Sequence, residues 1–117
     1  MVIKNFFPNE DIKVNDTGDG VKRKINAYND NLMCVEVYFD QGAIGKPHSH
    51  PHEQINYVVK GKFEIEINGV RKVCSVGDST YIQPDVVHSC LCVEEGMMLN
   101  IFTPCREDFV NHQDNSD

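Results

Sequence analysis

The sequence lacks several features that mark membrane, secreted and nucleic-acid-binding proteins. It has no apolar run near the roughly 18 residues that a transmembrane helix needs, and its first residues do not join a basic region to an apolar stretch, as a secretory signal would. Basic residues are scarce, with 11 Lys and Arg against 18 Asp and Glu and a net charge of −7. Because nucleic acids and anionic membranes are bound by clustered Lys and Arg, we expect neither as a partner.

The cysteines form no Cys-x-x-Cys pair, and their number, five, is odd. The disulfide framework of a secreted domain is usually even and denser, so this pattern favours a cytoplasmic protein. Cys90 and Cys92 are two residues apart and would share one face of a strand. The simplest interpretation is a pair of buried apolar side chains, and a metal or redox role is the alternative.

The 117 residues, 40% hydrophobic and 25% charged, have the size and composition of one globular domain. Asn68-Gly69 lies between two short apolar runs and predicts a type I′ hairpin turn. The spacing of such runs indicates an all-β fold, an antiparallel β-barrel of jelly-roll form. Strands are predicted over 21–27, 32–39, 54–59, 62–67, 70–74, 79–83, 88–93 and 98–103.

The two ends of the chain differ from the middle. Residues 1–20 close with a turn-rich run and are predicted to form an N-terminal arm, followed by the barrel domain over 21–111. Only 106–111, after a proline, has the pattern of a short helix. The remaining residues, 112–117, are polar, and we expect a disordered tail there.

Histidines are few but clustered. His48, His50 and His52 alternate, and side chains two apart on a strand point the same way, so His48 and His50 can place two imidazoles on one ion. Prolines on both sides indicate a sheet edge, a bulge or a strand end. The alternative is a solvated polar loop. His88 stands alone in a later segment, where by itself it is more often structural than functional.

The pattern around these histidines resembles the first motif of the cupin superfamily. That motif is a glycine, five residues, His-x-His, three or four residues, a glutamate, six residues and a glycine. Here Gly42, His48, His50, Gln54 and Gly61 follow the same spacing, with Gln54 in place of the glutamate. Glu53 is one residue away and would point to the opposite face of a regular strand.

The stretch from Gly77 to His88 is similar to the second, looser cupin motif. Pro84 lies one residue beyond the usual position of the proline in this motif, and the glycine that normally follows the proline is missing. The resemblance implies a jelly-roll barrel that holds one divalent transition metal ion, Zn, Ni, Fe or Mn. The ligands that it implies are His48, His50, Gln54 and His88. Since all four would be neutral, the ion would keep its charge and attract an anionic or polyhydroxy ligand.

A narrower resemblance is to small single-domain cupins of the pectin-degradation, or KdgF, type. Residues 48–67 carry it, and near the C-terminus Phe102 and Arg106 match positions of that family, whereas Asn100 stands where the family has a functional aspartate. The resemblance implies ring opening of 4,5-unsaturated uronates. Arg106 and the metal would then hold the sugar acid, and Phe102 would form an apolar wall. The alternative is that these are ordinary strand and helix-start residues.

Asn100 has no basic site at useful pH, although it can hold a ligand by hydrogen bonds. The proton transfer would pass to another group, with His52 or a metal-bound water as candidates. The sequence therefore leaves three functions open. They are a metal-dependent enzyme acting on a sugar acid, which is favoured, a non-catalytic cupin that binds or senses a small anionic or carbohydrate ligand, and an oxygenase. By analogy with small barrels that have open edges, a homodimer is also expected.

Overall fold

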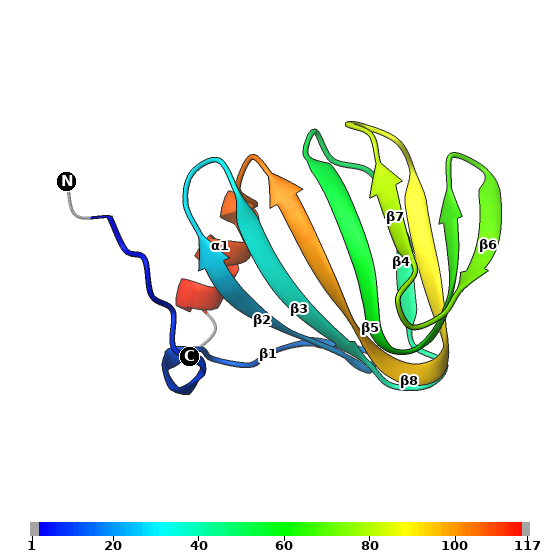
Figure 1. Ribbon diagram of the computed structural model, residues 1–117, viewed down its shortest axis with the longest axis horizontal. Helices are drawn as coiled ribbons and strands as arrows, with labels where there is room; N and C mark the ends of the chain where they lie inside the picture. Colours follow the sequence, from blue (N-terminus) through cyan, green and yellow to red (C-terminus); the bar gives the residue numbers. More distant parts are fainter. Residues whose placement is uncertain (1–2, 116–117) are drawn as a thin grey trace.

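The computed structural model describes residues 3–115. A short 3₁₀ helix over Asn9–Asp11 precedes eight strands and one helix, α1 (Glu107–Asn115). All strand pairs are antiparallel, and the order along the sheet is β1-β2-β3-β8-β5-β6, with β4 paired to β8 and β7 to β5 (Figure 1). The strands are β1 (Asn15–Gly18), β2 (Val21–Tyr28), β3 (Met33–Phe39), β4 (Ile44–His48), β5 (Glu53–Ile67), β6 (Val70–Cys74), β7 (Ser79–Ile82) and β8 (His88–Thr103).

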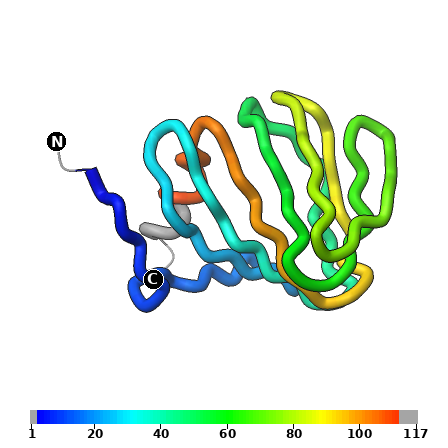
Figure 2. The backbone as a smooth tube through the Cα atoms, in the orientation of Figure 1, coloured from blue at the N-terminus to red at the C-terminus, as the bar shows by residue number. Residues whose placement is uncertain are grey.

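The predicted all-β antiparallel fold is confirmed, and the largest difference concerns its two central strands. β5 and β8 were each predicted as two strands, but each is one long strand that bends near its middle (Figure 2). The bend is built on two glycines. Gly61 has φ +84°, and a Cβ added at Gly96 would lie 1.9 Å from the Lys60 carbonyl oxygen. Only glycine allows the two backbones to approach so closely, and the bend folds the sheet around its core.

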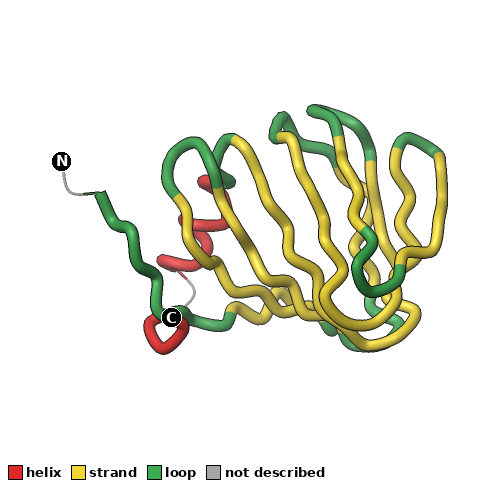
Figure 3. The backbone as a smooth tube through the Cα atoms, in the orientation of Figure 1, coloured by secondary structure: helices red, strands yellow, loops and turns green. Residues whose placement is uncertain are grey.

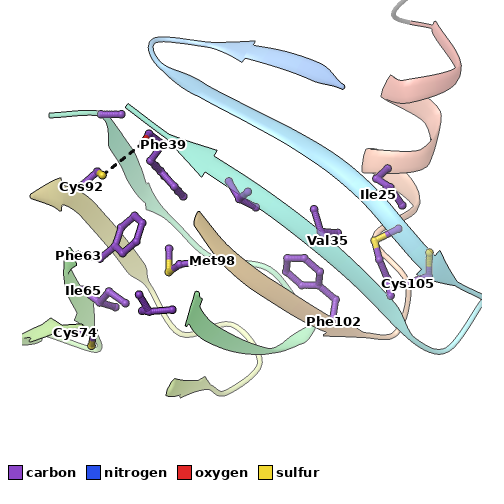
Figure 4. Close-up of a cluster of buried hydrophobic side chains, with 14 residues drawn as sticks. Ile25, Val35, Phe39, Phe63, Ile65, Cys74, Cys92, Met98, Phe102 and Cys105 are labelled. Atoms are coloured by element: carbon purple, nitrogen blue, oxygen red, sulfur yellow. Dashed lines mark hydrogen bonds between the residues drawn. The ribbon is translucent and has the colours of Figure 1, made fainter. Parts of the chain in front are cut away.

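The core is made by side chains that alternate along the strands. Met33, Val35, Val37 and Phe39 of β3 are all buried, with half-buried residues between them. They belong to one buried cluster with Phe63 of β5, whose ring meets that of Phe39 edge to face (Figure 4). This period of two is the reason that the strands were visible in the sequence.

Several boundaries differ from the predicted ones. β1 lies inside the predicted arm and pairs with β2, and β4 occupies a segment for which only an edge or strand end was expected. The helix α1 runs to Asn115, four residues into the segment predicted as a disordered tail, and the last two residues lie outside the described part of the chain. Its first turn carries Glu107 and Asp108, which favour a helix N-terminus.

The loops 49–52 and 83–87 lie together at one end of the strands (Figure 3). A hydrogen bond from the amide of Asp85 to the carbonyl of His50 joins them, at 2.8 Å. The turn at Asn68 and Gly69 has φ values of 50° and 81°, the two positive values of the predicted hairpin turn. This arrangement brings the end of β4 beside the start of β8, where the histidines lie.

Candidate metal centre

Three histidines from three segments meet at this end of the strands. His48 ends β4, His50 follows in the loop, and His88 begins β8, where it is the Cα partner of His48. Each can offer one ring nitrogen such that all three nitrogens lie within 4.8 Å of one another. The ring centroids of His48 and His88 are 4.3 Å apart, and those of His50 and His88 are 4.9 Å apart. His48, His50 and His88 therefore form a cluster that could hold a metal ion.

Backbone carbonyls orient these three rings. In each ring, Nδ1 lies at hydrogen-bonding distance from a carbonyl oxygen two residues away in the sequence, which leaves Nε2 free to act as a ligand when Nδ1 carries the proton. Imidazoles that bind metals are commonly oriented in this way by their other ring nitrogen. The distances are 2.7 Å from His48 to Lys46, 3.1 Å from His50 to His52 and 2.9 Å from His88 to Val86.

His88 gives a test of whether the cluster suits a metal. Its Nε2 atom is buried and has no hydrogen-bond partner among the described residues. Burial, opposed by the hydrogen bond to Val86, lowers the pKa of His88 to about 4, so the ring is neutral at pH 7. A neutral imidazole with a buried, unpartnered nitrogen has the state that a divalent transition metal requires. The residues present thus fit such an ion.

Gln54 completes this group from β5. Its Oε1 atom lies 2.9 Å from Nε2 of His50, and its Nε2 atom donates a hydrogen bond to Oδ1 of Asn56, at 2.6 Å. That second bond fixes which end of the amide faces the histidines. Glu53, the neighbouring carboxylate, instead accepts a hydrogen bond from the Tyr81 hydroxyl. Gln54 is therefore the β5 side chain that reaches the cluster.

A cavity of about 260 Å³ opens beside the histidines. His48, Gln54 and His88 line one part of it, and Arg23 and Arg106 also belong to its lining. None of the described residues that line the cavity is an aspartate or a glutamate. In a chain with a net charge of −7, this lining has positive charge without a carboxylate facing the ligand space.

Arg106 is positioned by its neighbours. Its Nε and one terminal nitrogen donate to the two carboxylate oxygens of Asp108 at 3.0 and 2.8 Å. The hydrogen bond from Arg106 holds the pKa of Asp108 below its usual value, so the carboxylate stays charged. The Arg106 guanidinium also lies 4.1 Å from the ring centroid of Phe109 on α1. The planar group is therefore held at the cavity with its remaining N–H groups available.

Of the other residues predicted for catalysis, Asn100 and Phe102 line the cavity and His52 does not. Asn100 lines the cavity, and its Oδ1 atom is buried without a hydrogen-bond partner. Phe102 lines it too and packs its ring edge to face against His50, with centroids 5.8 Å apart. His52 is not part of the lining; its ring lies 5.4 Å from that of His50. The structure thus gathers Asn100, Phe102 and Arg106 at the cavity and leaves His52 beside it.

Some residues at the cavity were missed in the sequence. Phe109 lines the cavity and Asp108 binds Arg106; both belong to the helix, whose contact with the sheet no local pattern reveals. Asn56 lies two residues beyond Gln54 on the same face, and Arg23 shares a face with Val21 and Ile25 on β2. The alternation of inward and outward residues was the signal that could have found Asn56 and Arg23. A polar side chain on the inward face of a strand needs a partner or a function.

The two cysteines of interest differ from each other. Cys92 is buried in the core, where its thiol donates to the carbonyl of Glu94 at 3.0 Å. Cys90 lines the cavity, and burial raises its pKa to about 11, so it stays a thiol at neutral pH. Neither belongs to the group of side chains that could share a metal, and all five cysteines are free.

Comparisons with known proteins agree with this geometry. A family model described as "Cupin domain" matches residues 35–102. The pectin degradation protein KdgF of Dickeya dadantii (strain 3937) is 38% identical over 110 residues, which cover 92% of this chain and 100% of that protein.

No helix in the described part of the chain is long and apolar enough to cross a membrane.

Two solved structures are similar over the same length. An RmlC-like cupin from Shewanella frigidimarina NCIMB 400 superposes with a TM-score of 0.87 and 40% identity, covering 92% of this chain and 96% of that one. KdgF from Halomonas sp. gives a TM-score of 0.86 and 38% identity, covering 92% and 99%. The residues that the family model matches, 35–102, include the three histidines of the cluster.

Proposed function

Since the chain belongs to the cupin family, with KdgF among its relatives, we propose that it binds one divalent transition metal ion and acts on a small sugar acid, by ring opening of 4,5-unsaturated uronates. The observation that carries the proposal is the cavity lining. It joins a histidine cluster suited to a metal with two arginines, and no carboxylate of the described residues belongs to it. Such a lining suits a ligand that has both oxygen donors and negative charge.

The proposed metal ligands are the Nε2 atoms of three histidines and Oε1 of Gln54. A neutral His50 ring carries one proton, so it can donate to His52 or to Gln54 but not to both. If the proton is on Nδ1, the lone pairs of Nε2 and Oε1 face each other across 2.9 Å, and a cation held by these two residues would remove the repulsion. When bound, the ion would act as a Lewis acid on carboxylate or hydroxyl oxygens and would lower the pKa of a bound water.

The chain's own residues would hold and orient the sugar acid. Arg106 is the proposed partner of the carboxylate, because a planar guanidinium suits two carboxylate oxygens. Asn100 would accept a hydrogen bond from a sugar hydroxyl through its unpartnered Oδ1 atom, and Phe102 would close the apolar side. His52 would act as a positioning residue, because its carbonyl fixes the His50 ring.

The test is conversion of 4,5-unsaturated galacturonate by metal-loaded protein, followed as loss of the ultraviolet absorbance of the conjugated double bond. We expect a rate above the spontaneous one, and we expect chelation of the metal to remove the difference. Arg106→Gln should raise KM, because the carboxylate loses its partner. A wild-type rate equal to the spontaneous rate, in protein shown to contain metal, would contradict the enzymatic proposal.

A second candidate, a cupin that binds or senses the ligand without turnover, is favoured by Asn100. Its amide stands where a proton-transferring carboxylate is expected and has no basic site. This function predicts that a uronate raises the Tm of the protein without being consumed. Turnover above the spontaneous rate by the wild-type protein would exclude it.

We also propose that the chain forms a homodimer through the outer face of the sheet and works in the cytoplasm. Ile55, Tyr57 and Val59 of β5 are 44%, 44% and 39% exposed, and Tyr81 of the paired strand β7 is 50% exposed. A second copy could cover this row of apolar side chains. Light scattering that gives the mass of a single 13.3 kDa chain would contradict the dimer. All five cysteines are free, which supports a location in the cytoplasm, where thiols are kept reduced.

A further inference from the structure

Arg23 is a charged side chain on the inward face of a core strand. It lies on β2 between Val21 and Ile25, which share its face, and it belongs to the lining of the same cavity as the histidine cluster. Arginine is seldom placed among inward-facing residues unless it is paired. The contacts of Arg23 therefore decide whether it is structural or available to a ligand.

No carboxylate is hydrogen-bonded to this guanidinium in the described part of the chain. Its Nε atom is buried and has no hydrogen-bond partner. Burial is the main reason that the pKa of Arg23 lies below its ordinary value, and Asp108 only partly opposes this effect. Both oxygens of Asp108 already accept hydrogen bonds from Arg106. One carboxylate thus serves two guanidinium groups, which leaves the pair with excess positive charge.

The two arginines meet at one aromatic ring. The guanidinium carbon of Arg23 lies 3.7 Å from the ring centroid of Phe109, and that of Arg106 lies 4.1 Å from it. Two carbons so close to one centroid are no farther apart than about 8 Å, and both arginines belong to the lining of the same cavity. Phe109 holds both planar groups at the cavity and limits their side-chain freedom.

We propose that Arg23 and Arg106 together bind the carboxylate of the ligand, and that Arg23 selects a sugar acid over the corresponding neutral sugar. The inference rests on the proposed function, in which Arg106 alone was given the carboxylate. It adds a second cation, which β2 supplies, whereas the histidines come from β4, the loop that follows it and β8. The charge of the ligand, rather than its ring, is what Arg23 recognises.

The test compares binding of two sugars by isothermal titration to the metal-loaded full chain. D-galacturonate carries a carboxylate, and D-galactose has a hydroxymethyl group in its place. We expect Arg23→Gln to weaken galacturonate binding by at least about tenfold and to leave galactose binding unchanged, since a charge-assisted pair is lost. Arg23→Lys should give a smaller loss, because the charge stays but the planar fork does not. Lys22→Gln, an equal change of charge at the exposed neighbour, is the matched control and should have no effect.

Each outcome is informative. Unchanged galacturonate binding by Arg23→Gln, or an equal loss for both sugars, would overturn the role of Arg23, and the thermal melt of each variant identifies a folding defect as the cause of an equal loss. A wild-type protein that binds neither sugar, or binds both alike, would overturn the inference together with the anionic-ligand part of the proposed function. A wild-type protein that prefers galacturonate but does not convert the unsaturated uronate would refute only the catalytic proposal.

Discussion

Nε2 of His50 and Oε1 of Gln54 lie 2.9 Å apart, and Gln54 is fixed in that orientation by the hydrogen bond that it donates to Asn56. The opposite nitrogen of His50 faces the carbonyl of His52. A neutral His50 ring carries only one proton, yet it faces two acceptors, the His52 carbonyl oxygen and Oε1 of Gln54. A cation held by His50 and Gln54 would relieve this mismatch, which is the physical basis of the proposed metal centre.

The first prediction concerns Gln54. Gln54→Leu removes the amide oxygen and should lower metal affinity by about 10- to 100-fold, while Gln54→Glu should keep the metal because a carboxylate oxygen takes the place of the amide. The measurement is competition with a chromophoric chelator. Glu53→Gln, which changes the neighbouring residue bonded to Tyr81, is the control and should bind metal as the wild type does. Equal affinities in the wild type and Gln54→Leu would remove Gln54 from the site.

The second prediction concerns Asn100. Asn100→Asp places a carboxylate at the cavity and should raise kcat for the unsaturated uronate by about 10²- to 10⁴-fold if proton transfer limits the wild type. Asn100→Leu should weaken ligand binding instead, because the acceptor Oδ1 is lost. Steady-state kinetics separates the two effects. A kcat of the Asp variant equal to that of the wild type would show that this position does not limit the reaction.

The third prediction concerns the bend in the sheet. Gly96→Ala places a Cβ against the Lys60 backbone and should lower the free energy of unfolding by about 2–4 kcal/mol. Gly77→Ala is the matched control, since Gly77 has a positive φ of 91° but no atom within 4 Å of an added Cβ; it should cost about 1–2 kcal/mol. Urea denaturation measures both. A smaller loss at Gly96 than at Gly77 would contradict the account of the bend.

The fourth prediction concerns stability in the presence of metal. An ion that binds only the folded protein stabilises it, by about 2.7 kcal/mol at a free concentration of 100 Kd. Removing the metal with a chelator should therefore lower the Tm of the wild type. His88→Gln should melt at the same temperature with and without added metal, because the buried Nε2 ligand is gone. A shift in His88→Gln as large as in the wild type would place the ion elsewhere.

Much of the fold was predictable because its strands carry the period of two. β3, with buried residues at every second position, and the turn at Asn68 and Gly69 were found directly. The continuity of β5 and β8 was not predictable in the same way. Gly61 marks a break in a local pattern, and only the partner backbone at Gly96 shows that the strand bends there instead of ending.

The histidine cluster was predictable because a motif of known spacing joins His48, His50 and His88. Strand alternation was not the reason, since β4 ends at His48 and His50 lies in the loop that follows. The arginine pair was not predictable. Arg23 and Arg106 are 83 positions apart, and their meeting depends on Phe109 of a helix that packs on the sheet. Contacts between distant segments are set by tertiary packing, which local patterns do not encode.

The central claim is that three histidines and Gln54 hold one metal ion beside the anion-binding cavity. It is tested most directly by elemental analysis of the purified chain after extensive dialysis against excess Zn²⁺, Ni²⁺, Fe²⁺ or Mn²⁺. We predict about one ion per chain for the wild type with at least one of these metals, and less than about a tenth of an ion for the double variant His48→Ala, His88→Ala. A metal-free wild type, or equal metal content in the two proteins, would contradict the account.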